Sequence, residues 1–193
     1  MSTMNVLICQ QPKELVWKQR EIPIPGDNEA LIKIKSVGIC GTDIHAWGGN
    51  QPFFSYPRVL GHEICGEIVG LGKNIADLKN GQQVAVIPYV ACQQCPACKS
   101  GRTNCCEKIS VIGVHQDGGF SEYLSVPVAN ILPADGIDPQ AAALIEPFAI
   151  SAHAVRRAAI APGAQVLVVG AGPIGLGAAA IATADGAPVV VPD

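Results

Sequence analysis

The sequence contains no apolar run long enough to cross a bilayer, which takes about 20 consecutive apolar residues. Its N-terminus lacks the basic flank and the cleavage site of a secretory signal peptide. There is no excess of basic residues, because 13 Lys and Arg stand against 16 Asp and Glu, for a formal net charge of -3. The sequence therefore gives no indication of a membrane span, of export, or of binding to nucleic acid or an anionic membrane surface.

Hydrophobic residues make up 49% and charged residues 15% of the chain, values typical of a soluble globular protein. The 193 residues suffice for one domain plus part of another. Eight cysteines would suit a small secreted disulfide scaffold, but this chain is not small and carries no export signal. We therefore expect reduced thiols and a cytoplasmic location.

Two short stretches carry residues typical of a metal site. The first is Cys40-Gly41-Thr42-Asp43-Ile44-His45 and the second is Gly61-His62-Glu63. Cys and His are zinc ligands, and a neighbouring carboxylate can complete or tune the coordination. Thr42 or Asp43 would also suit the cap of a short helix over 43–47, and either role is open from the residues alone.

Four cysteines follow the predicted strand over 83–88, with the spacing Cys92-x2-Cys95-x2-Cys98-x7-Cys106. This spacing favours a lobe folded around one tetrahedral ion over two redox Cys-x-x-Cys pairs, because three equally spaced cysteines leave no clean pair. Cys105 and Cys106 are equally suitable as the fourth ligand on chemistry alone.

The chain changes character along its length. Strand-like patterns run from residue 4 to 126, and after Pro139 the sequence becomes alanine-rich and helical over 140–144 and 150–160. We expect a domain boundary near Pro162-Gly163. Phe53, Phe54 and Tyr56 either line a substrate pocket or pack on the sheet, and the sequence leaves this open.

A glycine turn, Gly170-Ala171-Gly172-Pro173-Ile174-Gly175, lies between a predicted strand over 165–169 and a helix that runs to about residue 185. A second strand over 189–191 leads to Asp193. This context makes the turn a dinucleotide-binding pattern, in which the helix N-terminus attracts the pyrophosphate. An acid in the place of Asp193 would bind the adenosine ribose and repel a 2′-phosphate, which favours NAD over NADP.

With these motifs in order, the chain resembles the zinc-dependent medium-chain dehydrogenases, in the branch of polyol, threonine and sugar-acid dehydrogenases. Glu146-Pro147 also falls at the family position. The resemblance implies a GroES-like, partly open β-barrel catalytic domain over residues 1–160. It also implies the start of a Rossmann domain over residues 161–193. A Rossmann sheet has six strands, so the resemblance further implies that these residues are part of a longer enzyme and have little activity alone.

The resemblance implies two zinc ions and NAD as cofactors. Cys40, His62 and Glu63 would hold the catalytic zinc, with Glu146 either a ligand or a partner of the zinc-bound water. Thr42 would accept the substrate proton, His45 would pass it to solvent, and Asp43 would accept the ring N–H of His62. His45 as a plain surface histidine is the alternative. The family selects Cys106 as the fourth ligand of the structural zinc.

Within the branch, the sequence resembles bacterial sugar-acid dehydrogenases that oxidise the C5 hydroxyl of L-galactonate. This implies a small-molecule sugar acid or polyol as substrate, and a homodimer or homotetramer at full length. An L-threonine or simple secondary-alcohol dehydrogenase is the alternative enzyme. A zinc-stabilised module without turnover is the alternative from another class.

Overall fold

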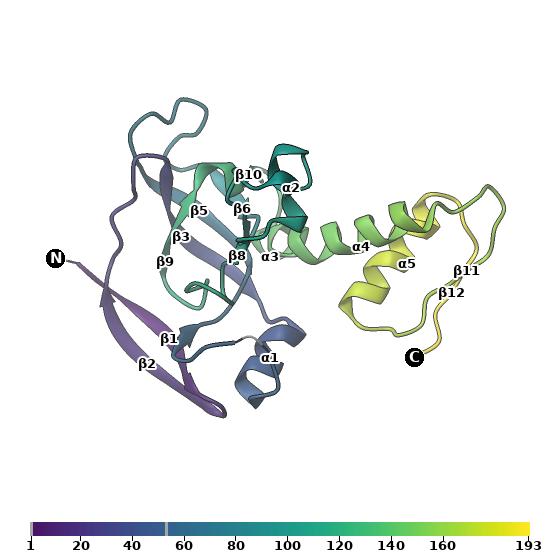
Figure 1. Ribbon diagram of the computed structural model, residues 1–193, viewed down its shortest axis with the longest axis horizontal. Coiled ribbons are helices and arrows are strands. Elements are labelled where there is room, and N and C mark those ends of the chain that lie inside the picture. Colours follow the sequence, from purple (N-terminus) through teal and green to yellow (C-terminus); the bar gives the residue numbers. More distant parts are fainter. Residues whose placement is uncertain (1, 53) are drawn as a thin grey trace. The chain divides into compact units, whose positions relative to one another are not determined.

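The computed structural model describes residues 2–52 and 54–193 (Figure 1). These residues form two compact units, Met1–Ala143 and Leu144–Asp193. None of the helices in this part of the chain combines the length and apolar character that crossing a bilayer requires.

A three-stranded antiparallel sheet begins the first unit. Its central strand, β1 (Thr3–Gln11), lies between β2 (Glu14–Glu21) and β4 (Arg58–Val59). Alternation along β1 buries Val6 and Ile8, which pack with Val59. Strand-like sequence at 6–9 and 15–17 predicted β1 and β2, whereas the two-residue strand β4 was not predicted.

A five-stranded antiparallel sheet holds the larger core of this unit. Its order is β10 (Ile131–Pro133), β6 (Gln83–Val86), β5 (Glu63–Leu71), β3 (Glu29–Gly38) and β9 (Tyr123–Pro127). Its buried side chains include Ile32, Ile68 and Val126. In the chain, the short helix η2 (Val128–Asn130) precedes β10, and the short helix α3 (Pro139–Ala143) follows it.

Helix α1 (Gly41–Gly48) follows β3 directly and ends at Gly49, which has a left-handed conformation. The sequence suggested Thr42 or Asp43 as a possible N-cap of this helix, but neither residue occupies that position. Cys40 occupies that position, and the Asp43 carboxylate, at the third helical position, accepts the Cys40 N–H at 2.9 Å. Asp43 therefore stabilises the helix start from inside the first turn.

The cysteine-rich segment of residues 92–106, here called the four-cysteine lobe, lies between two short antiparallel strands. These are β7 (Tyr89–Val90) and β8 (Ser110–Val111), and the lobe itself contains α2 (Pro96–Lys99) and the 3-10 turn η1 (Thr103–Cys105).

The second unit contains α4 (Ile145–Ala158), β11 (Val166–Leu167), α5 (Pro173–Ala184) and β12 (Val189–Val190), with the two strands parallel. The division into compact units falls between Ala143 and Leu144, and the predicted domain boundary near residue 160 stays a prediction. Helix α4 belongs to the second unit because it packs against α5, where the buried Ser151 hydroxyl donates to the Ile174 carbonyl at 2.9 Å. Helix α4 also includes Glu146 and Pro147 in its first turn. A proline is tolerated there because the N–H groups of the first turn have no intrahelical partner.

Candidate metal centres and cofactor turn

Cys40, His62 and Glu63 form one cluster, here called the mixed-ligand cluster. Cys40 lies just after β3 and the other two lie at the start of β5. These antiparallel strands pair Gly38 with Glu63, so the end of one meets the beginning of the other. One potential ligand atom from each of the three residues lies within 4.8 Å of the others. The sulfur, nitrogen and oxygen donors are the set that zinc accepts, and three protein ligands leave a fourth position open.

The close approach of Glu63 to β3 depends on Gly38. A Cβ atom at Gly38 would lie 1.9 Å from Glu63 Oε2 and 2.9 Å from Glu63 Cβ. Only glycine therefore allows this carboxylate to lie over the end of β3, where Cys40 follows two residues later. Sequence reasoning missed this residue, because its role depends on which residue it pairs with across the sheet.

Asp43 joins the two halves of the cluster through their backbones. Its Oδ2 accepts the N–H of Cys40 at 2.9 Å, and its Oδ1 accepts the N–H of Gly61 at 3.0 Å. The side chain is 3% exposed. His62 Nδ1 lies 3.8 Å from Asp43 Oδ1, which is within ion-pair range but longer than a hydrogen bond. Asp43 thus positions both ligand-bearing segments through their backbones, and its predicted role as acceptor of the His62 ring N–H stays a prediction.

Cys40 is prepared for metal binding by its neighbours. Its hydrogen bond with His62 is the main reason why the pKa of the Cys40 thiol lies below its usual value. Burial opposes this shift, and hydrogen bonds with the backbone and side chain of Thr42 add to it. A lowered pKa favours the thiolate, which is the form that binds metal.

Thr42 and His45 lie three residues apart on α1, a spacing that places them on the same side of the helix. Thr42 is half-buried beside Cys40 and His45 is exposed. This arrangement is compatible with the predicted proton path from the cluster to solvent. The roles of both residues stay predictions. Glu146 lies in α4, in the second unit, and its predicted place at the catalytic zinc also stays a prediction.

The four-cysteine lobe brings its predicted ligands together. One ligand atom each from Cys92, Cys95, Cys98 and Cys106 lies within 4.8 Å of the others. The backbone N–H groups of Cys92 and Lys108 both donate to Cys106 Sγ at 3.3 Å. Cys105 is exposed and outside the cluster, so the structure selects Cys106 from the two candidates. Four thiols at this spacing suit a closed tetrahedral zinc site.

Three of these thiols have shifted pKa values. Backbone hydrogen bonds from Gln94 and then Cys95 lower the pKa of Cys92 to about 6. Backbone hydrogen bonds from Cys98 and then Glu107 lower the pKa of Cys95. Burial raises the pKa of Cys98 to about 12. The lowered pKa values favour the thiolate at Cys92 and Cys95, and the raised pKa favours the protonated thiol at Cys98.

The glycine turn lies between β11 and α5, as predicted. Gly170 has a left-handed φ of 101°, and a Cβ at Gly175 would lie 2.0 Å from the Gly170 carbonyl oxygen. Gly172 is the N-cap of α5, and Pro173 begins the helix. The Gly170 N–H donates to the Pro192 carbonyl at 3.0 Å, which brings Asp193 to the same turn. A tight turn, a helix N-terminus and an adjacent acid fit a dinucleotide.

The aromatic residues before β4 act mainly in packing. Phe54 and Tyr56 contact each other edge to face, with ring centroids 4.9 Å apart, and both pack against Cys9, Ala46 and Leu60. Phe53 lies outside the described residues.

A model of the alcohol dehydrogenase GroES-like domain matches residues 26–136. The chain belongs to this family. The L-galactonate-5-dehydrogenase of Escherichia coli (strain K12) is 98% identical over 193 residues, which cover all of this chain and 57% of that protein. An L-threonine 3-dehydrogenase of Legionella pneumophila subsp. pneumophila (strain Philadelphia 1) is 39% identical over 194 residues, with 97% of this chain and 56% of that protein covered.

Among solved structures, an alcohol dehydrogenase (rspB) from E. coli CFT073, complexed with the cofactor NADH, is 39% identical. It superposes with a TM-score of 0.93 over 100% of this chain and 57% of its own. The chain thus spans less than two thirds of the length of these relatives. The predicted fold class, a GroES-like domain followed by the beginning of a Rossmann domain, is confirmed.

Proposed function

We propose that this chain carries the metal-binding and part of the cofactor-binding apparatus of a zinc-dependent dehydrogenase. The enzyme would move a hydride from a secondary alcohol of a sugar acid to NAD, and the C5 hydroxyl of L-galactonate is the proposed site. The observation that carries this proposal is 98% identity, over all 193 residues, to an L-galactonate-5-dehydrogenase. The mixed-ligand cluster supplies the chemistry that such a reaction needs.

In the proposed site, Cys40, His62 and Glu63 hold the catalytic zinc, and Glu146 is a further candidate ligand. A zinc ion there would lower the pKa of the substrate hydroxyl. Thr42 would take the hydroxyl proton, and the exposed His45, three residues further along α1, would pass it to solvent. Asp43 keeps the Cys40 and Gly61 backbones in register through its two hydrogen bonds.

In the second unit, Gly170, Gly172, Pro173, Ile174 and Gly175 form the turn against which the pyrophosphate of NAD would lie. NAD would accept the hydride at its nicotinamide ring. Asp193 would bind the adenosine ribose and disfavour a 2′-phosphate. In the four-cysteine lobe, Cys92, Cys95, Cys98 and Cys106 would hold a second, structural zinc.

We also propose a cytoplasmic location, because all eight cysteines are free thiols. We expect a homodimer or homotetramer at the length of the relatives, with no nucleic-acid or membrane partner.

The test combines metal analysis with an assay of NAD reduction on the enzyme at the length of its relatives. We expect two zinc ions per chain and NADH formation with L-galactonate, but little with sorbitol or L-threonine. Turnover of L-threonine alone would favour the alternative dehydrogenase, for which 39% identity to L-threonine 3-dehydrogenases is the supporting observation. One zinc and no turnover would indicate a structural module and contradict the proposal.

A further inference from the structure

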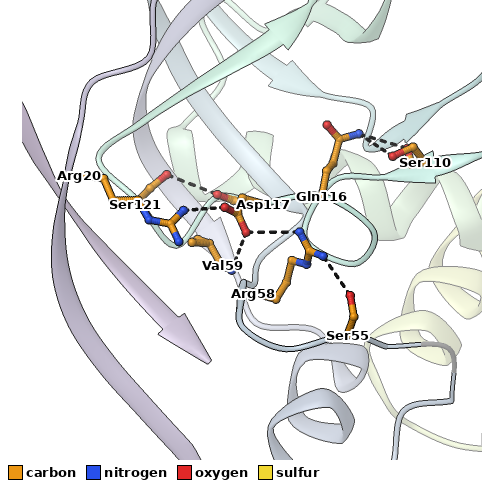
Figure 2. A network of polar contacts seen from close by, with 9 residues as sticks. Arg20, Ser55, Arg58, Val59, Ser110, Gln116, Asp117 and Ser121 are labelled. Carbon is orange, nitrogen blue, oxygen red and sulfur yellow. Dashed lines mark hydrogen bonds and ion pairs between the residues drawn. The ribbon is translucent and has the colours of Figure 1, made fainter. Parts of the chain in front are cut away.

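Asp117, in the loop between β8 and β9, binds three groups from two other segments of the first unit. Figure 2 shows its carboxylate between the guanidinium groups of Arg20 and Arg58. Arg20 Nη1, from β2, lies 2.6 Å from Oδ2, and Arg58 Nη1, from β4, lies 3.5 Å from Oδ1. Asp117 Oδ1 also accepts the Val59 N–H at 3.0 Å.

The backbone next to Asp117 continues this attachment toward the metal ligands. Gly118 N–H donates to the Val59 carbonyl at 2.8 Å, Phe120 N–H to the Leu60 carbonyl at 2.9 Å, and Gly119 N–H to the Gly61 carbonyl at 2.8 Å. The carbonyl groups of residues 59–61 therefore all accept hydrogen bonds from residues 118–120, which follow Asp117 in the same loop. The next two residues in the chain are the ligands His62 and Glu63.

The opposite side of the same segment is held by Asp43, which accepts the Gly61 N–H. Val59 and Leu60 are 1% and 2% exposed, so the segment is packed as well as hydrogen-bonded. Arg58 has further support from its hydrogen bond to Ser55 at 3.1 Å (Figure 2). The ion pairs are partly exposed, with side-chain exposures of 17–40%, so their net electrostatic stabilisation is small. Their geometry is the more specific feature, because one carboxylate joins β2, β4 and the loop.

We propose that Asp117 is a positioning residue for the mixed-ligand cluster. By binding Arg20, Arg58 and the Val59 N–H together, it fixes the segment from which His62 and Glu63 reach the metal. This inference rests on the zinc site of the proposed function. It concerns metal affinity at one site and not the stability of the whole fold, since residues that orient metal ligands commonly change affinity by about 10- to 100-fold.

The test measures zinc release from each site of the purified chain to a chromophoric chelator, with Cys40→Ala used to assign the phase of the mixed-ligand cluster. In Asp117→Ala, we expect this phase to be about 10- to 100-fold faster, while release from the four-cysteine lobe stays unchanged. Asp117→Asn keeps an acceptor for the Val59 N–H, so we expect a smaller acceleration. It also serves as the test variant if the alanine variant does not fold.

Glu67→Ala is the matched control. Glu67 makes a partly exposed ion pair with Lys35 at 2.7 Å and lies on β5, the strand that carries Glu63. We expect this variant to release both zinc ions at the wild-type rate.

Cobalt substitution supplies a second readout. The visible spectrum of cobalt at the mixed-ligand cluster should change in Asp117→Ala and stay unchanged in Glu67→Ala. Equal rates in the two variants, or equal acceleration at both sites, would overturn the inference alone. A wild-type chain that binds only one zinc would overturn the proposed function and this inference with it.

Discussion

The mixed-ligand cluster depends on Gly38 as well as on its three candidate ligands. Gly38 leaves the space that the Glu63 carboxylate occupies, and Cys40 follows two residues later in the chain. Cys40, His62 and Glu63 supply the donor atoms, but their approach to one another depends on this small residue and on the two backbone hydrogen bonds of Asp43.

Gly38→Ala tests this dependence. The added Cβ would overlap Glu63 Oε2, so the carboxylate must move away from Cys40. We expect zinc affinity at the mixed-ligand cluster to fall by about 10- to 100-fold, measured by competition with a chelator. Gly41→Ala is the control, because a Cβ there has no heavy atom within 4 Å. Equal affinity in the two variants would show that Glu63 does not need this space.

Removing a cysteine from the mixed-ligand cluster should mainly affect activity, whereas removing one from the four-cysteine lobe should mainly affect stability. Cys40→Ala should abolish activity at the length of the relatives and leave the fold largely intact. Cys95→Ala should mainly lower stability, because a structural zinc contributes folding free energy directly. A loss of about 5 kcal/mol would lower the unfolding midpoint by about 10–20 °C in a calorimetric scan. Equal loss of fold in both variants would contradict this division of the sites.

Pairing between strands brings the candidate ligands of the mixed-ligand cluster together. The register of β3 against β5 sets Gly38 beside Glu63, and Cys40 is the N-cap of α1, two residues after β3 ends. In the four-cysteine lobe, Cys95 is the N-cap of α2, Cys98 lies within α2, and Cys106 follows η1 directly, so these two short elements carry three of the four clustered thiols.

The lobe should release protons when it binds zinc, in a number that depends on pH. Metal ligands must be deprotonated, and the pKa of Cys92 is lowered to about 6 while that of Cys98 is raised to about 12. At about pH 7.5, Cys92 is already a thiolate and releases no proton, whereas Cys98 must release one. At about pH 5.5, Cys92 is mostly protonated, so we expect about one additional proton per zinc and a weaker affinity.

Calorimetric titration in two buffers of different ionisation enthalpy measures this release. Cys40→Ala, which leaves the lobe unchanged, isolates the signal of the four cysteines. The same proton count at both pH values would contradict the lowered pKa of Cys92.

The contact between α4 and α5 gives a separate prediction. Ser151 is fully buried, and a Cβ at Gly177 would lie 2.6 Å from its hydroxyl oxygen, so this contact has no spare room. Ser151→Leu should destabilise the second unit by about 1–3 kcal/mol in denaturant unfolding, because overpacking forces the helices apart. Ala154→Leu on the exposed side of α4 is the control and should change stability little. A similar loss in both variants would show that the cost comes from leucine in the helix and not from the contact.

Both metal clusters belong to one compact unit of the molecule. The mixed-ligand cluster and the four-cysteine lobe lie within Met1–Ala143, while the glycine turn lies within Leu144–Asp193. The candidate metal ligands and the proposed dinucleotide turn thus belong to separate compact units.

Removal of metal should therefore affect the units differently. We expect chelator treatment to speed amide hydrogen exchange most strongly in residues 89–111, and much less in residues 144–193. Exchange measured by mass spectrometry, with zinc restored as the control, checks this. A uniform increase along the chain would contradict the separation of metal-dependent and metal-independent units.

Local patterns in the sequence were sufficient for the longer strands, for the glycine turn and for Cys40, His62, Glu63, Cys92, Cys95 and Cys98 as candidate ligands that come together, while Glu146 stays a prediction. The period of two in residues 30–35 and the spacing of the four cysteines depend only on near neighbours, and the structure agrees with both. The helix cap at Cys40 and the packing of α4 against α5 were not predicted, because capping geometry and helix packing depend on the folded chain.

Contacts between distant segments decided the rest. Cys106 rather than Cys105 lies with the other three thiols, Asp43 accepts the N–H groups of Cys40 and Gly61, and Asp117 joins β2, β4 and the loop. Gly38 matters only through its partner across the sheet. Residue type and spacing specify which groups can bind metal or dinucleotide. Strand register and side-chain packing decide which of these groups meet, because they join residues that are remote in the chain.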